Sequence, residues 1–191
     1  MSLPSLVAIP PLLLPLASRA ERAWRAAVAD LHEAQGLDEW SAQRWAAFNR
    51  VSAASDFFTE HVVRDPLTLL ELVSFGELDR SFSPGELCGQ IANAVQQAST
   101  DDELGRVLRR QRNRQQIRII WRDLTRQADL IETCRDLSDM ADACIDQAYR
   151  WLYERHCQQF GTPIGHRSGE PQPMVILGMG RSEERRVGKE C

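Results

Sequence analysis

The sequence lacks an apolar run long enough to cross a membrane. A transmembrane helix needs about 20 consecutive apolar residues. The most apolar stretch, residues 1–18, is interrupted by four prolines and contains no basic residue. It has neither the charged start nor the unbroken apolar centre of a signal peptide. We therefore predict a chain with no membrane partner, in which residues 1–18 form a loosely ordered leader.

Metal-binding and disulfide patterns are also missing. The cysteines before residue 180 have spacings that match neither a zinc site nor a disulfide framework. The four histidines are equally scattered. We predict no metal site from these residues, and we predict buried, reduced thiols at the four cysteines. These cysteines are Cys88, Cys134, Cys144 and Cys157.

The composition indicates an ordinary globular protein. The 191 residues are 43% hydrophobic and 26% charged, with a formal charge of −4. This length supports one domain with a real core. The acidic balance argues against general nucleic-acid affinity. With no targeting segment recognised, we expect a cytoplasmic protein that binds neither nucleic acid nor membrane.

Residues 19–160 have the pattern of an all-helical bundle. From Arg19 onward, apolar residues recur with helical period, which predicts six to eight helices. No internal repeat is found. Several residues mark expected helix starts. They are the N-cap Ser55, Pro66 in a first turn, and the capping boxes Ser83–Glu86 and Thr100–Glu103.

The helix expected after Thr100 is unusually rich in arginine. Guanidinium groups bind phosphate through paired hydrogen bonds, so this helix could form a phosphate clamp. The favoured interpretation is a solvated face, or pairing with acidic neighbours on adjacent helices. No aromatic residues alternate with the arginines as they do in single-strand nucleic-acid sites. The arginines are Arg106, Arg109, Arg110, Arg112, Arg114, Arg118, Arg122 and Arg126.

The end of the chain changes character. A polar loop over residues 162–173 leads into an expected short strand at residues 174–177, followed by Gly178 and Gly180. A strand followed by Gly-x-Gly can open a dinucleotide-binding fold, but the third glycine and the following helix pattern are absent. Residues 181–191 (RSEERRVGKEC) back-translate into a common sequencing adapter. We therefore expect a foreign tail after Gly180.

The residues before that tail carry a specific resemblance. The stretch WLYERHCQQFGTPIGHRSGEPQPMVILGMG, residues 151–180, resembles the approach to the first nucleotidyltransferase domain of the bifunctional glutamine synthetase adenylyltransferase/adenylyl-removing enzymes. Two earlier segments resemble helices of the same family. They are ASDFFTEHVVRDP (residues 54–66) and LRRQRNRQQIRIIW (residues 108–121).

The resemblance implies a mostly α fold, in which a helical bundle leads into the first strand of a truncated nucleotidyltransferase (α+β) domain. Residues 161–180 would supply the loop and that strand, and Gly178 and Gly180 would lie near the nucleotide. The implied activity adds AMP from ATP to a tyrosine of glutamine synthetase and removes it with phosphate, giving ADP. Magnesium and the P-II signalling protein are the implied cofactor and regulator.

The resemblance also implies that the catalytic residues are missing from this chain. The family's metal-binding aspartates would follow Gly180, so we expect no catalytic or metal-binding residue before it and no activity in this polypeptide. An alternative needs no catalytic residues at all. In that alternative the chain is a stand-alone helical module whose arginine-rich helix docks an acidic partner.

Overall fold

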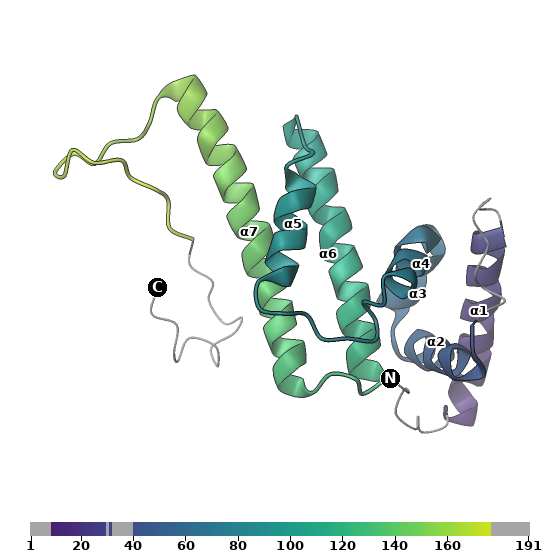
Figure 1. Ribbon diagram of the computed structural model, residues 1–191. Helices are drawn as coiled ribbons and strands as arrows, with labels where there is room; N and C mark the ends of the chain where they lie inside the picture. Colours follow the sequence, from purple (N-terminus) through teal and green to yellow (C-terminus); the bar gives the residue numbers. More distant parts are fainter. Residues whose placement is uncertain (1–8, 30, 32–39, 177–191) are drawn as a thin grey trace. The chain divides into compact units, whose positions relative to one another are not determined.

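The computed structural model describes residues 9–29, 31 and 40–176, and these residues are mostly helical (Figure 1). The mostly α fold is therefore confirmed. The elements are the 3-10 turn η1 (Pro11–Leu13) and helices α1 (Leu14–Ala29), α2 (Ala42–Ala54), α3 (Asp56–Arg64), α4 (Pro66–Ser74), α5 (Glu86–Val95), α6 (Asp101–Leu124) and α7 (Leu130–Phe160). No helix in this part of the chain is long and apolar enough to span a bilayer.

The chain divides into two compact units. The first contains residues 1–83 and 113–133, and the second contains residues 84–112 and 134–191. Helix α6 contributes its first half to the second unit and its second half to the first unit. The arginine-rich segment is thus shared between the two units.

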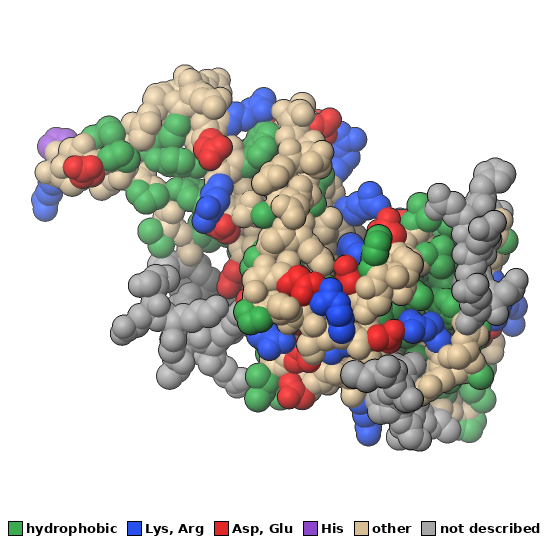
Figure 2. Space-filling view, viewed as in Figure 1, with side chains coloured by type: hydrophobic (Ala, Val, Ile, Leu, Met, Phe, Trp, Pro, Cys, Tyr) green, Lys and Arg blue, Asp and Glu red, His purple; other side chains and the backbone are tan. Residues whose placement is uncertain are grey.

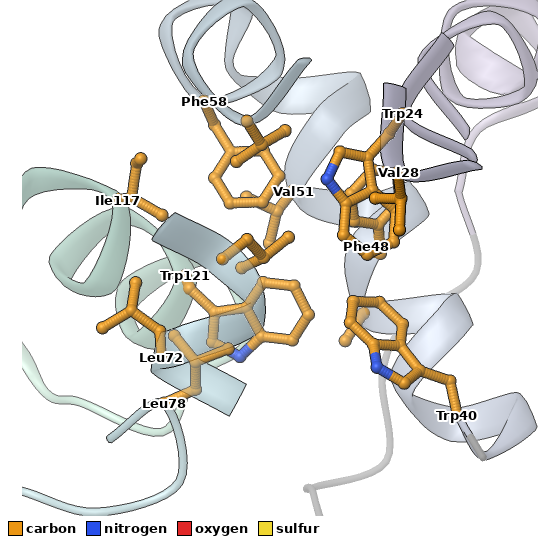
Figure 3. Packing of buried hydrophobic residues seen from close by; sticks show 13 residues of the cluster. Trp24, Val28, Trp40, Phe48, Val51, Phe58, Leu72, Leu78, Ile117 and Trp121 are labelled. Atoms are coloured by element: carbon orange, nitrogen blue, oxygen red, sulfur yellow. The ribbon is translucent and has the colours of Figure 1, made fainter. Parts of the chain in front are cut away.

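The first unit is built around an aromatic core (Figure 3). Trp24 of α1 packs against Trp40 and Phe48, with ring centroids 4.9 and 5.0 Å apart. Phe58 of α3 approaches Trp121 of α6, at 6.0 Å between centroids. Aromatic side chains bury large areas and prefer such tilted contacts. The buried cluster is completed by Val28, Ala47, Val51, Val62, Leu69, Leu72, Leu78 and Ile117.

The leader prediction is wrong for residues 11–18. Residues 11–13 form η1, and α1 begins at Leu14 instead of near Arg19. Proline is tolerated in a first helical turn because the amide hydrogen it lacks has no partner there, and Pro11 and Pro15 both occupy such turns. Ala17 is already buried. Residues 1–8 of the predicted leader lie outside the described residues.

Two of the predicted helix starts are confirmed. The hydroxyl of Ser55 accepts a hydrogen bond from the amide of Phe58 at 3.2 Å, which makes Ser55 the N-cap of α3. Pro66 is the first residue of α4. A side-chain cap and an N-terminal proline both satisfy or remove backbone donors that have no helical partner. These local signals determine the two starts.

The two capping boxes have different outcomes. At α6 the hydroxyl of Thr100 accepts from the amide of Glu103 at 3.2 Å as predicted, although the Glu103 carboxylate accepts from Ser99 instead of from the cap residue. The box predicted at Ser83 is wrong, because the N-cap of α5 is Gly85 with φ +80°. Glycine adopts this left-handed conformation without a steric penalty, so a turn precedes α5.

The second unit contains α5, the first half of α6 and most of α7. One face of α5 is buried through Leu87, Ile91 and Val95, at four-residue spacing. The four cysteines form no disulfide, as predicted, but their predicted burial is wrong: Cys134 is exposed and the other three are only partly buried. A small hydrophobic side chain in a helix is buried only where its face meets a neighbour.

The segment after α7 forms no strand within the described residues. An isolated β-bridge joins Ile164 to Pro171, and residues 174–176 have no secondary structure. The amide of Met174 donates to the hydroxyl of Tyr149 on α7 at 2.9 Å, which fixes this segment at one point. Leu177, the last residue of the predicted strand, lies outside the described residues.

Candidate functional site

The most elaborate polar site in the first unit surrounds residues 77–82, here called the 77–82 loop. This loop follows α4, whose end is closed by Gly76 in a left-handed conformation, φ +66°. Leu78 is fully buried and Phe82 nearly so. Backbone carbonyls in an irregular buried segment need hydrogen-bond donors from elsewhere. Arginines of α6 supply those donors.

Arg118 is fully buried, and its guanidinium binds backbone carbonyls of the 77–82 loop. Its Nε donates to the carbonyl of Glu77 at 3.0 Å, and its Nη2 donates to the carbonyl of Arg80 at 2.8 Å. The guanidinium carbon also lies 3.5 Å from the ring centroid of Phe82. A cation over an aromatic face is attracted to the ring, so the contact closes the loop over the side chain.

Arg122, one turn later, is 2% exposed. Its Nε and Nη2 both donate to Oε1 of Glu132, at 3.0 and 2.8 Å. Its Nη1 donates to the carbonyl of Leu78 at 3.1 Å. Nη2 also reaches the hydroxyl of Ser81 and the carbonyl of Gln127, both at 3.1 Å. One guanidinium therefore joins the loop to the start of α7.

Two further arginines bind the acidic side chains of the loop. Arg114 forms an ion pair with the carboxylate of Glu77 at 3.0 Å, and both side chains are largely buried. Arg44 of α2 donates to the carboxylate of Asp79 at 2.7 Å. Arginine is suited to such buried pairs because its planar fork matches carboxylate geometry. The 77–82 loop is thus held by four guanidinium groups.

This geometry corrects the interpretation of the arginine-rich helix. A solvated face is wrong for Arg114, Arg118 and Arg122, because all three are buried or largely buried. A phosphate clamp is equally wrong for Arg118 and Arg122, whose donors point to protein acceptors. Pairing with an acidic neighbour on an adjacent helix is confirmed for Arg122, whose partner Glu132 lies on α7, whereas Arg114 pairs with Glu77 of the 77–82 loop. The sequence signal for this burial is the four-residue spacing of the arginines. In a helix with about 3.6 residues per turn, side chains at that spacing move gradually around the helix and do not stay on one face.

The first half of α6 is different, because its arginines face solvent. Arg106, Arg109 and Arg110 are exposed, while Leu104 is buried on the opposite face of the same helix. Figure 2 shows basic side chains along the upper part of α6. The end of the Arg109 side chain lies over Gly105, where an added Cβ would be 3.3 Å from Nη1. These three residues form a basic stripe, here called the α6 arginine face.

A second surface feature lies between α1 and α3. An open groove of about 560 Å³ is lined at its base by Ala20, Ala23 and Val63 among other residues. Its rim combines two basic and two acidic side chains. They are Arg19, Arg64, Asp56 and Glu60. The mixed rim gives no preference for a ligand of one charge.

The predicted nucleotide-contacting residues, Gly178 and Gly180, lie outside the described residues. Their role stays a prediction. Within residues 9–29, 31 and 40–176, no group of three His, Cys, Asp or Glu side chains could hold a metal ion.

Comparison with known proteins finds similarity to one enzyme family. The family model for glutamate-ammonia ligase adenylyltransferase matches residues 45–185. The chain is 65% identical over 184 residues to the bifunctional glutamine synthetase adenylyltransferase/adenylyl-removing enzyme of Pseudomonas syringae pv. tomato, covering 95% of this chain and 19% of that protein. The enzyme of the same name from Pseudomonas aeruginosa is 58% identical over 183 residues, with the same two shares.

A third relative of the same name, from Pseudomonas putida, is 56% identical over 181 residues. The chain spans about a fifth of the length of these relatives. The family model nevertheless matches well over half of the chain. The chain belongs to the glutamate-ammonia ligase adenylyltransferase family.

Proposed function

We propose that this chain is the N-terminal part of an enzyme that adds AMP to a tyrosine of glutamine synthetase and removes it again. The single observation that carries the proposal is the 65% identity, across 95% of the chain, to a relative whose name states both activities. The substrates would be ATP for addition and phosphate for removal. Glutamine synthetase would be the protein substrate, the P-II signalling protein a regulator, and the cytoplasm the site of action.

In this proposal the described helices support a catalytic domain that follows them. The residues that would begin that domain are 161–180, and residues 174–177 would become its first strand once neighbouring strands are present. A single strand gains no ladder hydrogen bonds and is unstable alone in water. This accounts for the absence of a strand at residues 174–176. Gly178 and Gly180 would then approach the nucleotide.

We also propose that this polypeptide has no transfer activity by itself. Phosphoryl-type transfer of this kind uses metal ions held by carboxylates, which stabilise charge on the entering and leaving oxygens. The expected ligands are aspartates in a Ser-Ser-Asp-x-Asp stretch beyond Gly180. The helical part would contribute support and partner contacts.

Two measurements test the proposal together. In the first, the source gene is sequenced across codon 180. In the second, the chain is incubated with adenylylated glutamine synthetase, phosphate and magnesium, and the formation of ADP is measured. We expect the gene to continue as Lys-Leu-Gly-Gly and then Ser-Ser-Asp-x-Asp, and we expect no ADP from the chain alone. Extending the chain through that stretch should restore phosphate-dependent release.

Two outcomes would overturn the proposal. A stop codon after the helices would leave the stand-alone interaction module as the better interpretation. Turnover by the 191-residue chain above a mock preparation would show that the catalytic groups lie within it.

A further inference from the structure

We propose that an apolar stripe along α7 is the surface against which the catalytic domain that follows residue 180 packs. The proposal rests on the proposed function, because that function places such a domain after the helices. It concerns the second unit only. The stripe is here called the α7 apolar stripe, and it consists of Cys134, Leu137, Ala141, Cys144, Ile145 and Ala148.

The first step is the position of these side chains on the helix. Successive residues of an α-helix are rotated by about 100°, so the six side chains fall within an arc of about 100° that runs over roughly four turns. Every residue of 134–148 inside this arc is apolar, since a free cysteine behaves as a small hydrophobic residue. Such a stripe is typical of a helix that packs through that face against another element.

The second step is that α7 is already buried through a different face. Met140 and Ala143 are buried, and they lie about 120° around the helix from the centre of the stripe. The stripe is only partly covered, because Leu137 and Ile145 are 37% and 40% exposed and Cys134 is exposed. The helix therefore has one face that is covered within this chain and a second apolar face that is open at its largest side chains.

The third step is the distribution of exposed apolar side chains. In the described part of the second unit, every exposed large hydrophobic side chain lies on α7 or in the segment after it, and none lies on α5 or the first half of α6. Other exposed apolar side chains, such as Leu12 and Leu16, belong to the first unit. They do not lead into residues 161–180, whereas α7 does.

The fourth step identifies what covers the stripe. Two backbone hydrogen bonds, at 2.9 and 2.8 Å, close residues 163–172 into a reversal of the chain. The amide of Met174 then donates to the hydroxyl of Tyr149 at 2.9 Å, one turn beyond Ile145. This bond brings residues 174–176 back beside α7, and their side chains are themselves apolar and exposed. A domain that begins with these residues starts next to the stripe.

The chemistry of the stripe also fits this occupant. The α7 apolar stripe contains no charged residue, so it gives no attraction for a nucleic acid or for a charged partner surface. A β-sheet buries an apolar face against helices, and residues 174–177 would form the first strand of such a sheet. The structure thus favours the sheet of the following domain, packed on α7 through Leu137 and Ile145.

The test uses Cys134 as a reporter, because it is an exposed thiol of the stripe. The complete enzyme from the source gene and the 191-residue chain are each treated with iodoacetamide under native conditions, and alkylation of Cys134 is followed by peptide mass spectrometry. The Asn93→Cys variant supplies a control thiol at an exposed position of α5 in the same unit. We expect Cys134 to react at least about tenfold more slowly in the complete enzyme, and the control thiol to react equally in both.

A matched pair of variants tests whether the stripe causes this protection. Ile145→Glu places a charge in the stripe, and Leu16→Glu places one at a position of similar exposure on α1, 50% against 40%. Ile145→Glu should leave the urea midpoint of the 191-residue chain unchanged, because the side chain is open to solvent there. In the complete enzyme it should restore fast alkylation of Cys134, and Leu16→Glu should not.

Three results would overturn the proposal. The first is equal alkylation of Cys134 in the two polypeptides, and the second is a protection that Ile145→Glu does not reverse. If Cys134 stays reactive in a complete enzyme that releases AMP with phosphate, this inference fails and the proposed function stands. The third is a gene that stops after the helices, which would overturn the proposed function as well.

Discussion

Replacement of Arg122 by alanine should destabilise the first unit more than any surface substitution on α6. Arg122 is 2% exposed, and its guanidinium donates five hydrogen bonds. Two go to Glu132 and one each to Leu78, Ser81 and Gln127. The alanine variant leaves the Glu132 carboxylate, itself largely buried, without its cation. Two backbone carbonyls lose their donor at the same time.

The magnitude follows from the environment of this pair. Removing one partner of a buried ion pair costs about 3–5 kcal/mol, because the remaining charge stays desolvated. A folded domain is stable by only about 5–15 kcal/mol. A hydrophobic replacement can sometimes offset the loss of a buried pair. At Arg122 a hydrophobic side chain cannot fully offset the loss, because the backbone carbonyls of Leu78 and Gln127 would lose the donor that Arg122 supplies.

The assay is urea unfolding followed by circular dichroism, since urea does not screen charges as guanidinium does. The exposed Arg106→Ala on the same helix is the control, and surface substitutions of this kind change stability by about 0.5 kcal/mol or less. A double-mutant cycle with Glu132→Gln should show that the two losses are not additive. If Arg122→Ala costs less than about 1 kcal/mol, or no more than the control, the loop is not held by this guanidinium.

Three further predictions concern single positions. Gly105→Ala should raise the free energy of unfolding by about 1 kcal/mol, because glycine is a poor helix residue and, among the described residues, the atoms nearest to the new Cβ belong to the movable end of Arg109. A lower free energy of unfolding in urea would contradict this. Arg126→Gly should also stabilise, by about 0.5–1 kcal/mol, since Arg126 has φ +58° at the end of α6 where glycine is free of strain, and an unchanged urea midpoint would refute it. Partial burial raises the pKa of the Tyr153 phenol. In the Tyr149→Phe variant Tyr153 is the one remaining tyrosine, and the midpoint of its tyrosinate absorbance at 295 nm should lie above the ordinary pH of about 10. A midpoint at or below that pH would contradict the prediction.

The sequence predicted the helices best where the signal is local. Ser55 and Pro66 determine helix starts through one side-chain hydrogen bond and one missing amide hydrogen, and both act within a single turn. The predicted start of α1 is too late because proline interrupts a helix in most positions, whereas Pro11 and Pro15 lie in first turns, where proline is tolerated. The cap predicted at Ser83 is wrong because Pro84 and Gly85 together favour a turn, and the N-cap of α5 is Gly85.

The burial of the arginines could not be derived in the same way. Arg118 bonds to a carbonyl 41 residues earlier and Arg122 to one 44 residues earlier. The local pattern of α6 does not indicate that an irregular loop, whose carbonyls accept hydrogen bonds from arginine, lies against it. A charged residue is buried only where tertiary structure supplies acceptors. The predicted contacts of Gly178 and Gly180 with a nucleotide stay a prediction.

One geometric fact connects the two halves of α6. Six arginines recur every four residues from Arg106 to Arg126, and in a helix with about 3.6 residues per turn each step rotates the stripe by about 40°. Arg106 begins on the solvent side, and by Arg122 the stripe has rotated about 160°. The same repeat therefore presents cations to solvent in the first half and delivers them to the 77–82 loop in the second. A substitution at Arg106 should therefore leave the free energy of unfolding nearly unchanged, whereas a substitution at Arg122 should lower it.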